Sequence, residues 1–193
     1  VAGYVIHSAV HEARPDLTCV FHTHTTAGMA VAAQADGLLP ISIHASGFFN
    51  RIGYHDYEGP SLEGDEKSRL VASLGEHKVL ILKNHGLLAG GTTLEEAFIL
   101  MFRLQRACEI QVAARAGGAA LVIPDESTCQ AAAAGKSGAR AKPALSRMET
   151  GTSGPTTCGE CSAVQCSAVA VCVVPNNPLV PAHVIHTALH CIP

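Results

Sequence analysis

The feature that most constrains the fold is an alternation of helical patterns with short apolar runs, which extends from residue 1 to about residue 126. Apolar residues at helical spacing over residues 4–14 stop at Pro15, and a β-prone apolar run follows at 18–21. The same order recurs where an acidic helix start over 61–75 precedes the buried strand pattern of 78–83. Helices interleaved with short strands are typical of layered domains, so the sequence predicts an α/β fold.

Further elements are expected between and after these. They are a small-residue helix over 27–33, short strands at 40–44 and 52–53, and a turn at Gly90 and Gly91. Thr93-x-x-Glu96 is a capping box, which predicts the start of a long helix. That helix keeps its apolar spacing to about Arg115 and is expected to end before Gly117.

The periodic pattern ends at about residue 126. Residues 127–193 run through Gly/Ser/Lys/Pro-rich and Ser/Thr/Gly-rich stretches into a charge-free Cys/Val/Pro segment, and neither a period of 2 nor one of 3.6 persists. We therefore predict one domain over residues 1–126 and an irregular, low-order tail over 127–193.

Composition and charge exclude several classes of protein. The formal net charge is −3 and Trp is absent, so the chain lacks the basic face and stacking aromatics of a nucleic-acid binder. The apolar run at 162–174 is shorter than the ~20 residues that span a bilayer. No signal-peptide pattern is visible at the start of the sequence, so we expect a cytoplasmic protein without a membrane span.

Eight cysteines raise the question of disulfides. Cys19 and Cys108 stand alone inside apolar segments, which indicates buried thiols, and we expect the cysteines to be reduced. Cys158-x-x-Cys161 with the later His183 superficially resembles a zinc knuckle. The spacings match no standard zinc ribbon or finger, so we do not expect a zinc module there.

A candidate metal site lies at the ends of two expected strands. His22 and His24 are two residues apart on an extended segment, and such residues project to the same face. His85 follows the second buried run and offers a third nitrogen. Three histidines with an open position are a catalytic zinc arrangement, and a metal held this way can polarise a carbonyl and stabilise an enediolate. On spacing alone, ordinary polar residues at strand ends are an equally good interpretation.

Several longer motifs occur in order between residues 2 and 123. They are AGY at 2–4, HSA at 7–9, ARPD at 13–16, HTHT at 22–25, GLLPIS at 37–42, YHDYEG at 54–59, VLILKNHGL at 79–87 and ACEIQV at 107–112. Together they resemble the class II aldolase/adducin family, with the greatest likeness to the adducin head domain and its bacterial relatives.

The resemblance implies a three-layer α/β/α sandwich with a central mixed sheet, incomplete at the N-terminus. It implies a divalent metal, Zn²⁺ first, bound by His22, His24 and His85. It also implies a homo-oligomer, commonly a tetramer, with active sites near subunit interfaces. Members of the family cleave or epimerise small sugar phosphates, so the implied activity is that of an aldehyde-lyase or epimerase on such a compound or a related hydroxy-carbonyl.

One departure concerns the proton-transfer group. Catalytic members carry an acidic residue four positions before the histidine that matches His7, and here that position is Gly3, as in the adducin-like branch. Proton transfer must then come from another group or not occur. Tyr54 and His55 are the candidate catalytic residues, although a surface turn before Pro60 would also explain them. The alternative function is a non-catalytic, oligomerising module that binds actin or spectrin partners.

Overall fold

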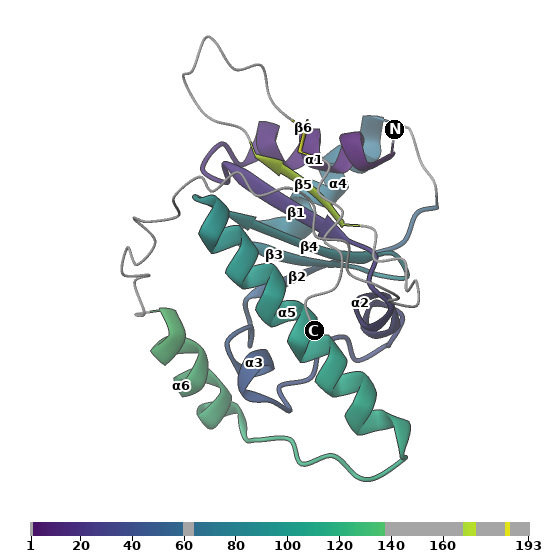
Figure 1. Cartoon of the computed structure of the whole chain (residues 1–193), viewed down its shortest axis with the longest axis vertical. Helices are drawn as coiled ribbons and strands as arrows, with labels where there is room; N and C mark the ends of the chain where they lie inside the picture. Colours follow the sequence, from purple (N-terminus) through teal and green to yellow (C-terminus); the bar gives the residue numbers. More distant parts are fainter. Residues whose placement is uncertain (1, 60–63, 138–167, 173–183, 186–193) are drawn as a thin grey trace, which may run out of the picture.

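The computed structural model describes residues 2–59, 64–137, 168–172 and 184–185 (Figure 1). Its helices are α1 (Ala2–Ala13), α2 (Thr26–Ala32), α3 (Ile43–Ser46), α4 (Gly64–Leu74), α5 (Leu94–Ala116) and α6 (Glu126–Ser137). Its strands are β1 (Cys19–Thr23), β2 (Ile52–His55), β3 (Val79–Leu82), β4 (Gly86–Gly91), β5 (Ala168–Cys172) and β6 (Val184–Ile185).

The strands form one mixed sheet in the order β2-β3-β4-β1-β5-β6. Strands β2 and β3 are parallel, and every other neighbouring pair is antiparallel. In the centre of the sheet the register places His22 opposite Leu88 and Thr23 opposite Leu87. The end of β1 therefore lies beside the start of β4, at the same edge as the β3–β4 turn.

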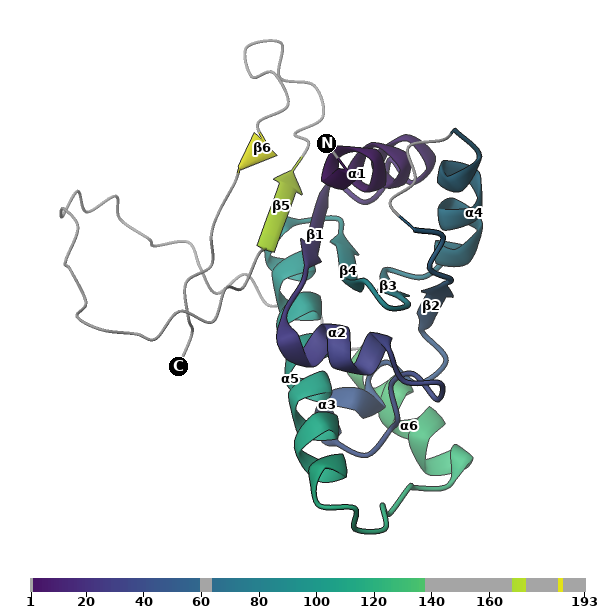
Figure 2. The same ribbon diagram turned by 90° about the vertical axis from the view of Figure 1, so that its right-hand side faces the viewer.

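Helices cover both faces of the sheet, as Figure 2 shows with α1 and α4 on one side and α5 on the other. Alternate residues of the strands separate into two apolar cores, as the period of a strand requires. Val20, Leu80 and Leu88 pack with α1 and α4, whereas Phe21 and Ile81 pack with α2 and α5. The predicted three-layer α/β/α sandwich is confirmed.

The long helix α5 begins as its capping box predicts. Thr93 accepts a hydrogen bond from the backbone N–H of Glu96 at 3.2 Å, and the Glu96 carboxylate accepts one from the N–H of Thr92 at 2.8 Å. The first bond satisfies a donor that a helix start leaves without a partner, and the second ties the residue before the cap to the first turn. Gly117 is the C-cap. The predicted limits of this helix are therefore confirmed.

Two local predictions are wrong. The strand expected at 40–44 is replaced by α3, because Ser42 caps a helical turn by accepting a hydrogen bond from the N–H of Ala45 at 3.1 Å. The turn expected at Gly90 and Gly91 is the end of strand β4. These glycines lie where Leu17 and the start of α5 come close to the strand, so the missing side chains serve packing and not a turn.

Regular structure continues beyond the predicted boundary at residue 126. Helix α6 begins at that residue and contacts α3, and β5 pairs with β1. No periodicity of the sequence indicated either element. The proposed division of the chain stays a prediction, and Cys158, Cys161 and His183 lie outside the described residues.

The expectation of reduced cysteines is wrong for Cys19, which is disulfide-bonded in the structure. In the register of the sheet its Cα lies opposite that of Cys172. Cys108 and Cys129 are free and buried, and burial raises the pKa of the Cys108 thiol to about 12. Within the described part of the chain, no helix combines the length and apolar character needed to cross a membrane.

Candidate metal centre

His22 and His24 are positioned by the end of β1. His22 follows Val20 at a spacing of two residues, so it points to the face of the sheet that α1 and α4 cover. Its ring meets that of His7 on α1 edge-on, with 6.4 Å between the ring centroids. Two residues further on, His24 lies beside His22 just beyond the strand, as the predicted spacing requires.

His85 is placed by the tight turn between β3 and β4. Asn84 has a φ of 55°, a left-handed conformation that asparagine adopts more readily than most residues. Its N–H donates to the carbonyl of Ala32 at 3.0 Å, and the N–H of His85 donates to the carbonyl of Leu82 at 3.0 Å. The next residue, Gly86, passes so close to Thr23 that a Cβ there would collide with the Thr23 carbonyl oxygen. This turn brings His85 beside the end of β1.

The three predicted ligands converge. One ring nitrogen from each of His22, His24 and His85 lies within 4.8 Å of the other two. The Nε2 atoms of His22 and His24 are 2.7 Å apart, and the three pairs of ring centroids lie 4.5, 4.8 and 4.9 Å apart. His22 is buried, while His24 and His85 are half-buried at the mouth of a cavity.

The surroundings keep these imidazoles neutral. Burial first, and then the neighbouring rings of His24 and His85, lower the pKa of His22 to about 3. Burial also lowers the pKa values of His24 and His85. The Nδ1–H of His22 donates to the carbonyl of Leu87 at 3.0 Å, so the neutral ring carries its lone pair on Nε2, the atom that faces His24.

This donor set fits a divalent metal. Neutral imidazole nitrogens are ligands for zinc, and a hydrogen bond from the other ring nitrogen to a carbonyl is the usual way in which a ligating histidine is oriented. His22 has that bond. A cavity next to His24 and His85 leaves room for a further ligand, which is the difference between a catalytic site and a closed structural one.

The cavity has a volume of about 360 Å³. It lies between the sheet, α1, α2 and α4. Its lining residues are Val5, Ile6, His24, Met29, His55, Asp56, Tyr57, Glu58, Gly59, Glu66, Leu70, Leu82, Lys83, Asn84 and His85. It combines an apolar wall with several titratable groups, as binding sites for small molecules do.

The structure separates the two predicted catalytic residues. His55 lines the cavity beside the triad, is buried, and has its Nδ1 3.1 Å from the Ser73 hydroxyl. Its Nε2 has no hydrogen-bond partner among the described residues. Tyr54 projects to the opposite face of β2, where its hydroxyl accepts a hydrogen bond from the N–H of Leu38 at 3.2 Å.

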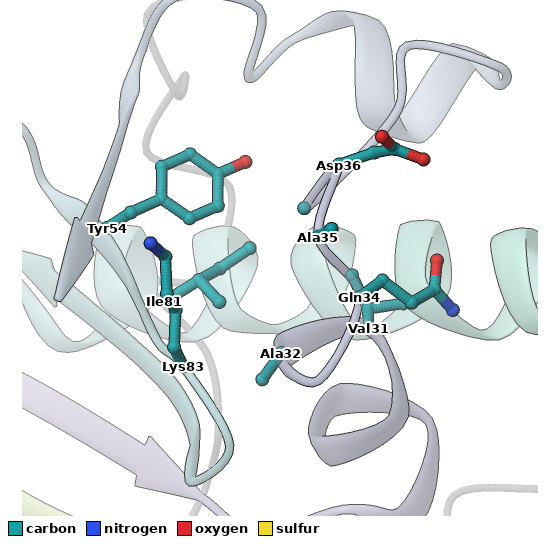
Figure 3. A pocket seen from close by; sticks show the side chains of 9 residues that line it. Val31, Ala32, Gln34, Ala35, Asp36, Tyr54, Ile81 and Lys83 are labelled. Atoms are coloured by element: carbon teal, nitrogen blue, oxygen red, sulfur yellow. The ribbon is translucent and has the colours of Figure 1, made fainter. Parts of the chain in front are cut away.

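Tyr54 lines a second cavity of about 250 Å³ between the end of α2 and the sheet. Figure 3 shows its ring and Lys83 on the side of the sheet, across from Gln34 and Asp36. Burial raises the pKa of the Tyr54 hydroxyl. Within this chain the structure therefore brings His55, and not Tyr54, into the cavity of the triad.

Two residues near the triad were not predicted as functional. His7 is only 3% exposed and neither of its ring nitrogens has a hydrogen-bond partner in the described part. The one signal that the sequence offers is its i, i+4 spacing from His11, which places both rings on the same side of α1. Glu66 lines the cavity, but in the sequence it is one of the acidic residues that suit a helix start.

The sequence matches a known family over most of this region. The description of the family is Class II Aldolase and Adducin N-terminal domain, and the match covers residues 2–112. A Pseudomonas aeruginosa protein that is named for class 2 aldolases is 54% identical over 126 residues, which are 65% of this chain and 49% of that protein. Rat alpha-adducin is 49% identical over 120 residues, which are 61% of this chain and 16% of alpha-adducin. The chain thus spans about half the length of the bacterial relative.

Solved structures agree with the sequence comparison. An aldolase II superfamily protein from Pseudomonas syringae superposes with a TM-score of 0.68 at 50% identity, over 74% of this chain and 56% of that one. L-fuculose 1-phosphate aldolase from Glaciozyma antarctica superposes with a TM-score of 0.60 at 28% identity, over 69% of this chain and 50% of that one. With its fold, its histidine cluster and the match over residues 2–112, this chain belongs to the family of class II aldolases and adducins.

Proposed function

We propose that the chain is a metal-dependent class II aldolase-type lyase or epimerase that acts on a small sugar phosphate or a related hydroxy-carbonyl compound. The observation that carries the proposal is the convergence of nitrogens from His22, His24 and His85 at the mouth of a cavity large enough for such a substrate. The likeness to an L-fuculose 1-phosphate aldolase supports the choice of substrate class.

In this proposal His22, His24 and His85 hold a divalent metal, with Zn²⁺ as the first candidate because all three donors are imidazoles. When bound, such an ion polarises a substrate carbonyl. The apolar wall that Ile6, Leu70 and Leu82 provide limits water around the substrate. His55 is the nearby proton donor, through its unpartnered Nε2.

Tyr54 is outside the cavity of its own chain and is 38% exposed. Its proposed role as a proton donor therefore requires a neighbouring subunit, in a cytoplasmic homo-oligomer such as a tetramer. Membership of the family supports oligomerisation.

The alternative proposal is a non-catalytic, adducin-like module that oligomerises and binds actin or spectrin. The specific observation in its favour is Gly3, which leaves helix α1 without a carboxylate one turn before His7. The 49% identity to alpha-adducin over 120 residues gives it further support.

The deciding experiment combines metal analysis with turnover. The purified chain should bind about one zinc per subunit and should cleave L-fuculose 1-phosphate or another ketose phosphate, with the triose phosphate as the measured product. His22→Ala, His24→Ala and His85→Ala should each lose most of the metal and all turnover, because two ligands seldom hold zinc. His44→Ala on α3, which lies on the other face of the sheet, is the matched control and should change neither.

A fully metallated chain without turnover on any sugar phosphate would contradict the lyase proposal. Cosedimentation of that same protein with actin or spectrin would then support the adducin-like module. Normal zinc content in the three triad variants would show that the metal is bound elsewhere.

A further inference from the structure

The hydroxyl of Ser73 on α4 has a single proton, and its hydrogen bonds show where that proton lies. The hydroxyl donates to the carbonyl of Arg69, four residues earlier on the same helix, at 2.9 Å. A carbonyl oxygen can only accept, so this bond uses the one donor of the serine. The Ser73 oxygen therefore accepts the hydrogen bond that joins it to the ring of His55 at 3.1 Å.

This arrangement fixes the tautomer of His55. Its Nδ1 carries the hydrogen that Ser73 accepts, so in the neutral ring Nε2 carries a lone pair. The same rule gives the same tautomer to His22, whose Nδ1–H donates to the carbonyl of Leu87. In its resting state His55 is thus a hydrogen-bond acceptor at Nε2, and it can donate from that atom only after the atom has taken up a proton.

The lone pair of His55 is buried and faces the cavity of the triad. His55 is 6% exposed, and its Nε2 has no hydrogen-bond partner among the described residues. An unpaired buried atom of this kind costs free energy until a donor from a ligand or a solvent molecule pairs with it. His55 lines the cavity with His24 and His85, but it is not a member of the group whose ligand atoms lie within 4.8 Å of one another. Its lone pair is therefore open to a molecule that occupies the cavity beside the triad.

We propose that Ser73 is a positioning residue that holds His55 in the tautomer of a base, and that Nε2 of His55 takes a hydroxyl proton from the substrate; this inference rests on the proposed lyase function. The proton comes from the hydroxyl that is β to the carbonyl. The bond between the α and β carbons breaks, its electron pair stays on the α carbon as the enolate, and the β carbon leaves as an aldehyde. Nε2 then gives the proton to the α carbon, which completes the ketone product and restores the neutral ring.

The first test reads the tautomer directly and needs neither metal nor turnover. Long-range proton–nitrogen NMR correlation spectra are recorded on the metal-free full chain with isotope-labelled histidine, at a pH at which the rings are neutral. The signals of His55 are assigned by their loss in His55→Gln. Nδ1 of His55 should resonate as a protonated nitrogen and Nε2 as an unprotonated one.

Variants of α4 test whether Ser73 sets this tautomer. Ser73→Ala should shift the ratio of the two tautomers towards the Nε2–H form on the order of five- to tenfold, which corresponds to the loss of one hydrogen bond. Ser73→Thr keeps the hydroxyl and should keep the native spectrum. Ser68→Ala removes a hydroxyl from an exposed position of the same helix and is the matched control, which should leave His55 unchanged.

The second test measures cleavage of L-fuculose 1-phosphate by zinc-loaded variants. His55→Gln should lower kcat by roughly 10²–10⁴-fold. Ser73→Ala should lower kcat on the order of five- to tenfold with little change in KM or in zinc content, because only the tautomer with a lone pair on Nε2 can take the proton. Ser73→Thr should recover the native kcat, and Ser68→Ala should turn over like the native chain.

The outcomes separate the two proposals. A native tautomer with the hydrogen on Nε2, or native kcat in zinc-loaded His55→Gln, would overturn the role of His55 as the base and leave the lyase function intact. A native tautomer ratio and native kcat in Ser73→Ala would overturn the positioning role of Ser73. A zinc-loaded native chain without turnover would overturn the lyase function and, with it, the proton transfer assigned to His55.

Discussion

Burial of imidazoles controls how individual residues respond to pH. The pKa of His7 is lowered to about 4, first by burial and then by His11, and that of His22 is lowered to about 3. In the unfolded chain both titrate near the ordinary value of 6.5. Above pH 6.5, His7 and His22 are neutral in both the folded and the unfolded state, so their protonation takes nothing from the free energy of unfolding. Below it, the unfolded state takes up the protons first, so stability falls as the pH falls towards the folded pKa values.

The metal-free protein should therefore lose stability between pH 6.5 and about 4, by up to about 1.4 kcal/mol per pH unit for each of these two histidines. Urea unfolding between pH 7.5 and 5, in the presence of a chelator, measures the slope. His7→Leu should flatten it by roughly one proton, and it removes no hydrogen bond, because neither ring nitrogen of His7 has a partner in the described part. An unchanged slope in His7→Leu would show that His7 is protonated equally in both states.

The sequence predicts residue positions only as far as strand periodicity extends. The spacing of His22 and His24 correctly indicated that the two rings would lie side by side, because a strand repeats every two residues. For the same reason the adjacent residues Tyr54 and His55 point to opposite faces of the sheet. The sequence alone did not show which of the two faces the triad. The choice depends on the packing of β2 against α4, where Ser73 contacts the ring of His55.

At the scale of elements, the close passage of β4 past the end of β1 holds the centre together. A Cβ on Gly86 would collide with the carbonyl oxygen of Thr23 and lie 3.0 Å from Cδ2 of His24. Gly86→Ala should therefore push the start of β4 away from β1 and displace His24. We expect a loss of about 1–3 kcal/mol in the free energy of unfolding, together with weaker zinc binding.

Urea unfolding and chelator competition measure both effects. Gly117→Ala is the matched control, because its φ is −90° and a Cβ there would meet nothing within 4 Å. Gly86→Ala with native stability and native zinc affinity would show that β4 can move without disturbing the centre.

Elements with a local signal were predicted well, and elements that depend on distant contacts were not. Helix α5 carries its own start signal at Thr93, so its limits followed from the sequence. Strand β4 ends in two glycines, which in isolation indicate a turn. Only its partners, Cys19 opposite Gly91 and Val20 opposite Gly90, show that these residues extend the ladder. Such long-range pairing leaves no local pattern in the sequence.

At the scale of the whole molecule, the main question is whether residues 1–126 form a complete unit. Strand β1 is buried along all five of its residues and lies between β4 and β5. Without β5 it becomes an edge strand that exposes unpaired backbone groups next to His22. The pairing of β1 with β5 thus connects the predicted tail to the predicted domain.

Chains that end at residue 126 or 137 should therefore be less stable than the full chain. Loss of the β1–β5 ladder removes several hydrogen bonds of about 1 kcal/mol each, so we expect Tm to fall on the order of 10 °C. Thermal unfolding measures the loss, and light scattering should detect association through the exposed edge of β1.

The chain that ends at 137 retains α6 against α3, so the difference between the two truncations isolates the contribution of that helix. Cys19→Ala in the full chain removes the disulfide while it keeps β5, and it separates the covalent link from the pairing. If both truncated chains keep the full Tm and the full zinc content, the predicted boundary at 126 is a true domain limit and β5 does not stabilise the sheet.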